Sequence, residues 1–193
     1  MKTLVVYAHP NPNSFNHALF ETLVASLRES GHEVRIRDLY REGFDPVLGE
    51  AHLADASARK GPGEDVQREQ EAITWAESLV FVYPLWWFDR PAVLKGWFDR
   101  VFTNGFAFRY TPEGMEGLLR HRKAMVIVTT GGTVRDFDVI GARDQILRPT
   151  TDGTLRFCGI HQIVDKVFFA VPLASDEERR AMLDEVRDLA KAF

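Results

Sequence analysis

The stretch from Leu79 to Phe102 constrains the fold of this chain more than any other part of its sequence. It opens with Leu79-Val80-Phe81-Val82, a β-branched and aromatic run without polar alternation, which is typical of a strand buried on both faces of a parallel sheet. We expect Tyr83-Pro84 to end this strand, because proline donates no backbone hydrogen bond. Beyond Pro91, which suits the first turn of a helix, apolar residues at helical spacing predict a largely buried helix.

Three bulky aromatic residues, Trp86, Trp87 and Phe88, fill the loop between this strand and helix. Aromatic clusters usually pack in cores, and that interpretation stays open. The alternative is a flat ligand wall, because the cluster lies in a loop bounded by two prolines, and loops run over protein surfaces. Ligands of open α/β sheets bind at the carboxyl ends of the strands, where this loop lies. We therefore favour the ligand wall.

Length and composition narrow the class of protein. A chain of 193 residues has the size of one domain, and we expect residues 1–193 to form a single one. The one cysteine, Cys158, excludes an internal disulfide and fits a reducing compartment. A net charge of −4 argues against nucleic acid as the main partner. No apolar run reaches membrane-spanning length and the chain opens with a strand-like run, so we expect a cytoplasmic protein.

A second buried strand, predicted over Thr3–Tyr7, leads into a polar loop and a helix. Apolar residues between Phe20 and Leu27 form the helix stripe, and Gly31 suits the left-handed position after its end. The N-cap candidates are Asn13, Ser14 and Asn16.

The start of this helix is a candidate phosphate site. A helix N-terminus offers unpaired N–H groups and partial positive charge, and His9, Ser14 and Asn16 could add side-chain donors. Ordinary capping needs only one such residue and leaves the question open. The loop has neither the GxGxxG nor the GxxxxGK[ST] spacing, so a dinucleotide fold or a P-loop loses support.

The remaining elements also alternate between strand and helix. Glu33–Leu39 alternates in polarity and predicts a strand nearer the sheet edge, and two apolar runs predict the fourth and fifth strands, Ala124–Val128 and Ile163–Val171. The other predicted helices are a weak one over Ala51–Arg59, one over Val66–Ala76, and a final one after the capping-box spacing of Ser175 and Glu178.

The fourth strand ends in Thr129-Thr130-Gly131-Gly132. A double glycine lets the backbone approach a ligand closely and aim its N–H groups at carbonyl acceptors. The alternative is a plain turn.

Phe106, Phe108 and Tyr110 alternate and should lie on one side of an extended segment. This segment is either a strand covering the core edge, a substrate wall or a subunit contact.

Five strands alternating with helices predict an α/β, doubly wound parallel sheet. In the flavodoxin-like order 2-1-3-4-5, the loops after the first, third and fourth strands meet at one crevice. The first of these loops offers hydrogen-bond donors for a phosphate, the second flat aromatic rings and the third backbone N–H groups. A ligand with a tricyclic ring and one phosphate, such as FMN, would use all three.

On these residues the sequence resembles the NAD(P)H:quinone oxidoreductases of the DT-diaphorase type and the related flavoproteins that accompany potassium-efflux systems. The matching segments are Ala8-His9, Ser14-Phe15-Asn16, Pro84-Leu85-Trp86-Trp87-Phe88, Pro91–Phe102, Thr129-Thr130-Gly131-Gly132 and Phe157-Cys158-Gly159.

The resemblance implies a flavin bound by three sets of residues: His9, Ser14, Phe15 and Asn16; Pro84, Leu85, Trp86, Trp87 and Phe88; and Thr129, Thr130, Gly131 and Gly132. It also implies a homodimer in which the segment from Phe106 to Tyr110 helps to wall the partner's site. The candidate substrate contacts are Trp87, Phe88, Phe108 and Tyr110. The chain lacks the C-terminal extension of the larger FAD-containing members, so we expect FMN, with FAD as the alternative.

One departure from the family concerns the positions thought to stabilise charge on the reduced flavin. Where the family often has tyrosine and histidine, this chain has Phe137 and Arg143. Phe137 cannot donate a hydrogen bond, whereas Arg143 would stabilise an anion only if its side chain points inward. These two residues are the candidate catalytic positions.

The leading hypothesis is an enzyme that transfers a hydride from NADH or NADPH through the flavin to a quinone. The alternative is an ancillary flavoprotein subunit docked on a potassium-efflux transporter. An obligate electron carrier is disfavoured because such proteins are typically strongly acidic. A flavin-free binding domain would stay colourless with FMN and FAD.

Overall fold

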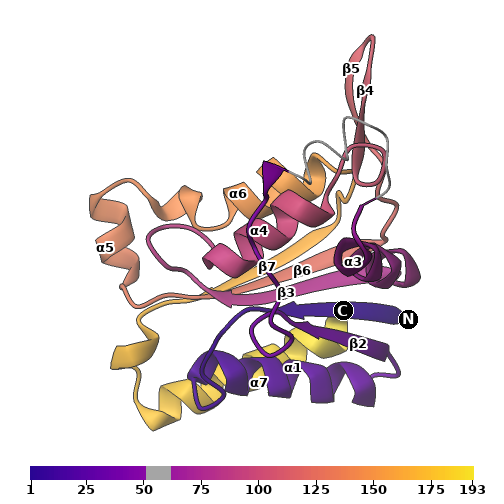
Figure 1. The fold of residues 1–193 in the computed structure, drawn as a ribbon. Coiled ribbons are helices and arrows are strands. Elements are labelled where there is room, and N and C mark those ends of the chain that lie inside the picture. The colour runs from indigo at the N-terminus through magenta and orange to yellow at the C-terminus, as the bar shows by residue number, and fades with distance from the viewer. Residues whose placement is uncertain (51–61) are drawn as a thin grey trace.

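A computed structural model of the chain describes residues 1–50 and 62–193 (Figure 1). Its centre is a five-stranded sheet in the order β2-β1-β3-β6-β7, in which every neighbouring pair is parallel. The strands are β1 (Lys2–Tyr7), β2 (Glu33–Asp38), β3 (Ser78–Pro84), β6 (Lys123–Thr129) and β7 (Ile163–Phe168). The predicted order 2-1-3-4-5 is confirmed once a separate hairpin, β4–β5, is left out of the count.

Helices cover both faces of the sheet, as Figure 1 shows. On one face, α1 (Phe15–Glu29) and α7 (Asp176–Ala192) pack beneath β1, β3 and β6 with Leu19, Leu23 and Val186 fully buried. On the other face lie α3 (Glu64–Trp75), α4 (Ala92–Val101) and the short helices after β6. Each inner strand has apolar side chains on both faces, because each face is covered by helices.

Several helix ends follow their predicted signals. Ser14 is the N-cap of α1 and accepts a hydrogen bond from the His17 amide. Gly31, just past α1, has a φ of 82°, which a side chain would strain. Ser175 and Glu178 form the capping box of α7. The weak helix predicted over Ala51–Arg59 lies outside the described residues.

Two predicted strand ends are wrong. Tyr83 and Pro84 belong to β3, because proline at the last strand position removes no ladder donor and Leu85 N–H continues the ladder to Thr129 O at 2.8 Å. The fifth strand stops at Phe168 instead of Val171, because Ala170 takes a positive φ of 52° and begins a 3₁₀ turn.

The segment after α4 forms a hairpin of β4 (Phe108–Thr111) and β5 (Gly114–Gly117), which projects from the body of the molecule (Figure 1). Phe106 precedes the strand in a turn closed by Thr103 O, so it does not continue the alternation of Phe108 and Tyr110. Between β6 and β7 lie α5 (Val134–Val139), a 3₁₀ turn η1 (Arg143–Gln145), α6 (Arg148–Thr150) and a π-helical turn η2 (Thr151–Arg156). No helix in the described ranges is both long and apolar enough to span a membrane.

Candidate functional site

The three predicted loops meet at the carboxyl edge of the sheet. Asn16, in the first turn of α1, donates from Nδ2 to Thr129 Oγ1 at 3.0 Å and so joins the first loop to the end of β6. The His9 ring lies 5.8 Å from the Trp86 ring, which joins the first loop to the aromatic one. Residues 113 positions apart in the sequence are therefore held side by side by a buried hydrogen bond.

The start of α1 has the donors and the charge for an anion. Among the described residues the amides of Phe15 and Asn16 in its first turn have no acceptor, and the helix dipole adds partial positive charge there. Asn16 is 3% exposed, yet its Oδ1 has no donor within reach among residues 1–50 and 62–193. A buried acceptor without a partner is costly, which favours a ligand that donates to it.

His9 is fixed in one tautomer by its surroundings. Its Nδ1 accepts a hydrogen bond from the Asn11 amide at 3.1 Å, so the neutral ring carries its proton on Nε2. Burial lowers the pKa of His9 below its ordinary value. At neutral pH the residue is thus a neutral donor, and a bound anion would raise its pKa.

The aromatic turn, Trp86–Asp89, has a strained backbone. Trp86 and Asp89 exchange N–H···O bonds of 2.9 and 3.1 Å, while Trp87 and Phe88 have φ values of 50° and 63°. This is the pattern of a type I′ turn, which normally takes Asn-Gly because left-handed conformations cost side-chain-bearing residues roughly 1–2 kcal/mol each. Two bulky aromatics at these positions are unfavourable for folding, and the inference is that they serve another purpose.

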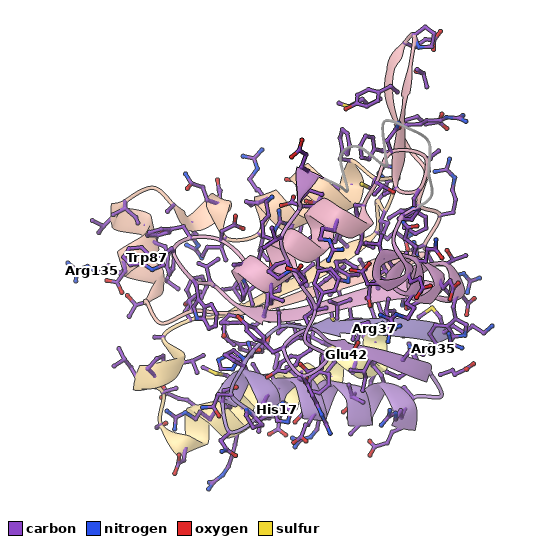
Figure 2. The ribbon with its side chains drawn as sticks, in the orientation of Figure 1. His17, Arg35, Arg37, Glu42, Trp87 and Arg135 are labelled. Carbon is purple, nitrogen blue, oxygen red and sulfur yellow. The ribbon has the colours of Figure 1, made fainter. Side chains whose placement is uncertain are left out.

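The aromatic side chains of this turn face outward. Trp87 is 96% exposed, and Trp86 and Phe88 are also exposed. Figure 2 shows Trp87 at the outer rim of the molecule, on the side that also carries α5. Pro84 is buried and Leu85 packs against the core, so these two residues fix the turn rather than forming its surface. The core-packing interpretation of the three aromatics is therefore wrong for the single chain.

The double-glycine loop, Thr129–Gly132, presents free backbone donors. Thr130 is held by its N–H to Phe168 O at 2.9 Å and by its hydroxyl to Gly132 O at 2.8 Å. Across the described part of the chain, the N–H groups of Gly131 and Gly132 have no acceptor. A Cβ on Gly132 would come within 3.1 Å of the Phe137 ring, so the glycine is also needed for packing.

The two candidate catalytic positions differ in burial. Phe137 is 7% exposed, and its ring packs against Phe88 at 5.9 Å and Phe169 at 5.8 Å. Arg143 lies on the surface, where its guanidinium pairs with Asp138 at 3.5 Å. Phe137 thus supports the aromatic turn from behind. An inward role for Arg143 would require it to leave its ion pair and stays a prediction.

Phe108 and Tyr110 lie on the hairpin instead of at the sheet edge. Their rings contact each other at 5.7 Å, and Phe108 also contacts Phe157 at 5.8 Å. Tyr110 is 70% exposed and stands opposite the exposed Met115 on the paired strand. The hairpin therefore carries an apolar tip away from its own chain's site.

Sequence reasoning missed the groups behind the aromatic turn. Arg90, Tyr83 and Thr150 form a polar cluster there, and a cavity of about 720 Å³ opens beside it, lined by Phe88, Asp89, Gly141, Asp144, Gln145, Arg148, Pro149, Asp152 and Gly153. The position of Arg90 directly before Pro91 indicated this cluster only weakly, because residues 148–154 come next to Arg90 only in the folded chain.

The donor set fits a planar ring with acceptors on its edge and an anionic tail. Exposed aromatic faces suit the ring, the free glycine N–H groups suit its oxygen and nitrogen atoms, and the start of α1 suits a phosphate. Fold and site together define the class of flavodoxin-like α/β proteins.

The chain belongs to the flavodoxin-like fold family, whose model matches residues 1–192. It is similar to the ribosyldihydronicotinamide dehydrogenase (quinone) of Pongo abelii, with 36% identity over 94% of this chain and 87% of the relative. It is also similar to an uncharacterized NAD(P)H oxidoreductase of Haemophilus influenzae, with 34% identity over 95% and 91% of the two chains. Among solved structures, the NAD(P)H:quinone oxidoreductase from Methanothermobacter marburgensis superposes with a TM-score of 0.88 at 32% identity, covering 99% of this chain and 96% of that one. The predicted resemblance to quinone oxidoreductases is confirmed.

Proposed function

We propose that this chain is a flavin-dependent NAD(P)H dehydrogenase that reduces quinones or similar acceptors by two-electron hydride transfer. The observation that carries the proposal is the exposed, strained aromatic turn placed beside free backbone donors and a helix N-terminus. The dehydrogenase and oxidoreductase names of the relatives support the same chemistry and do not favour the transporter-subunit alternative.

Each loop has a separate role in this proposal. His9, Ser14, Phe15 and Asn16 hold the phosphate tail at the start of α1. The Pro84–Phe88 segment supplies one wall for the ring, and the Thr129–Gly132 loop donates backbone N–H groups to its edge. A flavin held by these residues would supply the hydride-transfer chemistry between NADH or NADPH and the acceptor. Trp87 and Phe88 then provide the apolar surface on which a flat quinone stacks.

The Gly131 and Gly132 N–H groups carry the electrostatic role. Fixed dipoles aimed at an atom that gains negative charge stabilise it without reorganisation. Because Phe137 offers no proton donor, backbone amides replace side-chain donors in this part of the site.

The flavin we propose is FMN, with FAD as the alternative, and the start of α1 would bind the phosphate of either one. We also propose that residues 1–193 unfold as one domain, supported by the two apolar clusters that share the central sheet.

A homodimer is the proposed assembly. The apolar hairpin tip, with Tyr110 and Met115 exposed, suits a contact with a second copy, where Phe108 and Tyr110 would wall the partner's site. Light scattering of the wild type and of Tyr110→Ser tests this. A wild-type protein that stays monomeric at micromolar concentration would contradict it.

The central experiment is an anaerobic titration. The purified protein is loaded with FMN or FAD, freed of unbound flavin and titrated with NADH or NADPH. We expect the flavin absorbance band to bleach and to recover when a quinone is added. A band that does not bleach with either nucleotide would contradict the proposed function, and identification of the released flavin separates FMN from FAD.

A matched pair of histidine variants tests the site. His9→Gln removes the imidazole at the carboxyl edge and should weaken flavin binding about tenfold. His161→Gln changes an exposed histidine just before β7, at the opposite edge of the sheet, and should leave binding unchanged. Equal effects of the two variants would place the flavin elsewhere.

A further inference from the structure

Arg90 is a buried cation directly behind the aromatic turn. Its side chain is 7% exposed, and its guanidinium lies 4.8 Å from the ring of Phe98 in α4. Its backbone N–H donates to Asp89 Oδ1 at 2.7 Å, and its Nε lies 3.7 Å from the same oxygen. The hydrogen bond to the Asp89 carboxylate, at the last position of the turn, thus comes from the Arg90 backbone. The Arg90 side chain adds an ion-pair contact, since its Nε has no hydrogen-bond partner among the described residues.

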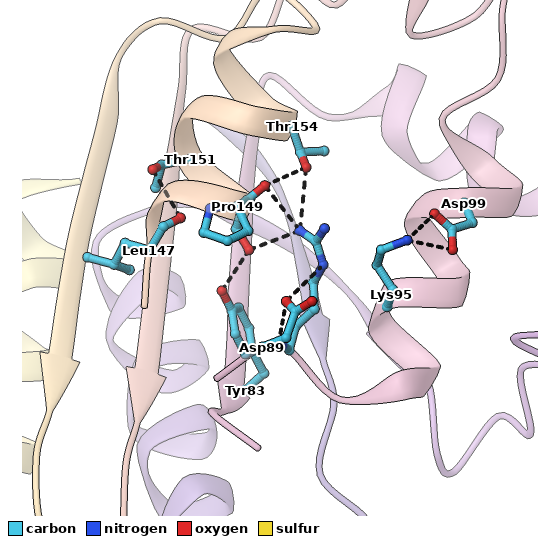
Figure 3. Close-up of polar contacts among 10 residues, drawn as sticks. Tyr83, Asp89, Lys95, Asp99, Leu147, Pro149, Thr151 and Thr154 are labelled. Carbon is cyan, nitrogen blue, oxygen red and sulfur yellow. Dashed lines mark hydrogen bonds and ion pairs between the residues drawn. The ribbon is translucent and has the colours of Figure 1, made fainter. Parts of the chain in front are cut away.

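The guanidinium also reaches the segment between β6 and β7. Its Nη1 donates to Thr150 Oγ1 at 3.1 Å and lies 3.4 Å from both Pro149 O and Thr154 Oγ1. Figure 3 shows the contacts of Pro149 and Thr154 meeting at one guanidinium nitrogen. The hydroxyl oxygen of Tyr83, near the end of β3, lies 2.8 Å from Thr150 Oγ1. One side chain therefore connects the aromatic turn, α4 and α6–η2.

This segment is itself built around Pro149. Thr154 Oγ1 donates to Pro149 O at 2.8 Å, and Thr151 Oγ1 donates to Leu147 O at 3.1 Å, within a π-helical turn (Figure 3). Such turns widen the helix by one residue and are frequent at functional sites. Pro149 and Thr150 in α6, together with Thr154 in the π-helical turn, place three oxygen acceptors around Arg90.

An arginine is the side chain suited to this position. Its planar guanidinium stays charged and donates in several fixed directions, whereas a lysine ammonium is a compact charge on a flexible stem. The aromatic turn has an unfavourable backbone and outward side chains, and it is closed by the two backbone hydrogen bonds between Trp86 and Asp89. Phe137 supports it through Phe88, and Arg90 adds a second support through Asp89.

We propose that Arg90 is a positioning residue: by joining Asp89 to Thr150 and Thr154, it fixes the Trp87-Phe88 turn in the orientation that the ring and the acceptor require. The proposal rests on the proposed function, since it concerns the wall of the same flavin site. Arg90 itself touches neither flavin nor acceptor in this assignment.

The test compares Arg90→Lys with Lys95→Gln. Lys95 lies on the exposed face of α4, five positions beyond Arg90, and its ion-pair partner among residues 1–50 and 62–193 is Asp99 (Figure 3). Lys95→Gln therefore controls for replacing a nearby basic side chain that makes no hydrogen bond to the aromatic turn. In Arg90→Lys we expect amide hydrogen exchange over residues 85–90 to become about tenfold faster, as when one charge-assisted hydrogen-bond set is lost, with exchange in α7 unchanged. Lys95→Gln should match the wild type in both regions.

A second readout uses the loaded enzyme. Arg90→Lys should raise the KM for the quinone about tenfold while the melting temperature stays within a few degrees of that of Lys95→Gln. A purely structural role would lower the melting temperature and speed exchange evenly across α4 and the sheet, and that result would overturn the proposal. Unchanged exchange at residues 85–90 would also overturn it.

Thr154→Val keeps the proposal falsifiable if Arg90→Lys does not fold. It removes one acceptor of Arg90 and should give the same pattern at smaller size, so normal exchange at residues 85–90 in Thr154→Val would count against it. The exchange measurement needs no flavin. A wild type that binds neither FMN nor FAD would therefore refute the proposed function, while the exchange of Arg90→Lys would still decide whether Arg90 holds the turn.

Discussion

Trp87 and Trp97 lie ten positions apart in one continuous stretch and have opposite environments. Trp97, on α4, is fully buried and donates from its indole nitrogen to Glu69 Oε2 at 2.9 Å. Trp87 is 96% exposed and has a backbone conformation that favours glycine. The first residue is explained by the stability of the fold. The second contributes little to stability, which is why we assign it to binding.

The largest expected effect separates these two tryptophans. Trp97→Ala leaves a cavity between α4 and the sheet and removes the donor to Glu69 Oε2, so we expect the free energy of unfolding to fall by about 3–5 kcal/mol. Trp87→Ala should change it by less than about 0.5 kcal/mol while weakening quinone reduction at least tenfold. Urea unfolding and steady-state kinetics measure the two quantities. Similar losses of stability would remove the contrast.

A double substitution tests whether the aromatic turn is strained. Replacing Trp87-Phe88 by Asn-Gly gives the turn its preferred residues, so we expect the free energy of unfolding to rise by about 1 kcal/mol, net of the lost contact between Phe88 and Phe137. The same change removes the aromatic surface and should abolish tight flavin binding. A protein that is less stable and still binds flavin would show that the strain has no functional basis.

The pH dependence of stability also distinguishes the exposed site near Trp87 from the buried core near Trp97. Burial lowers the pKa of His9 at the site, of His32 and of His121 behind α3. The unfolded chain therefore takes up protons first as the pH falls below about 6.5, so stability is full above that pH and is lost on further acidification. Unfolding midpoints measured across this range check the sign.

Two single variants separate the contributions of His121 and His9 to the pH dependence of stability. His121→Gln should flatten the pH dependence, because the His121 ring is largely buried and, among residues 1–50 and 62–193, its hydrogen bond is the one from Nε2 to Ile73 O at 2.9 Å. His9→Gln should flatten it less and should instead alter the pH dependence of flavin binding. If His9→Gln flattened the pH dependence of stability and His121→Gln altered flavin binding, the placement of the flavin site at His9 would be contradicted.

The smallest effect concerns Cys158. This thiol is 3% exposed, and burial raises its pKa to about 11. We expect maleimide at neutral pH to leave the folded protein unmodified and Cys158→Ala to retain wild-type turnover. Rapid labelling with loss of activity would contradict this, because it would show that the region around Cys158 is accessible and affects the site.

Much of the fold was readable from local patterns. Continuous apolar runs identified the inner strands, because a strand buried on both faces is apolar throughout. The alternation in Glu33–Leu39 identified an edge strand, because a strand that is less buried on one face alternates in polarity. Errors occurred at ends such as Pro84 and Val171, where a single backbone hydrogen bond or a positive φ at Ala170 decides the boundary.

The site divides in the same way. Sequence alone indicated which loops carry unusual residues, because His9, Trp87 and Gly131 follow predicted strands and the order of a doubly wound sheet brings strand ends together. It did not show the left-handed backbone of Trp87 and Phe88, the surface ion pair of Arg143 or the burial of Arg90.

Sequence by itself thus determined the succession of strands and helices, since hydrophobic periodicity and helix caps act over a few residues. Only the tertiary structure decided how the aromatic turn is held and what faces it. The acceptors of Arg90 lie about 60 residues away in the chain, at a separation of 59 to 64 positions, and their meeting depends on packing of the whole sheet. Contacts of that range carry no local signature.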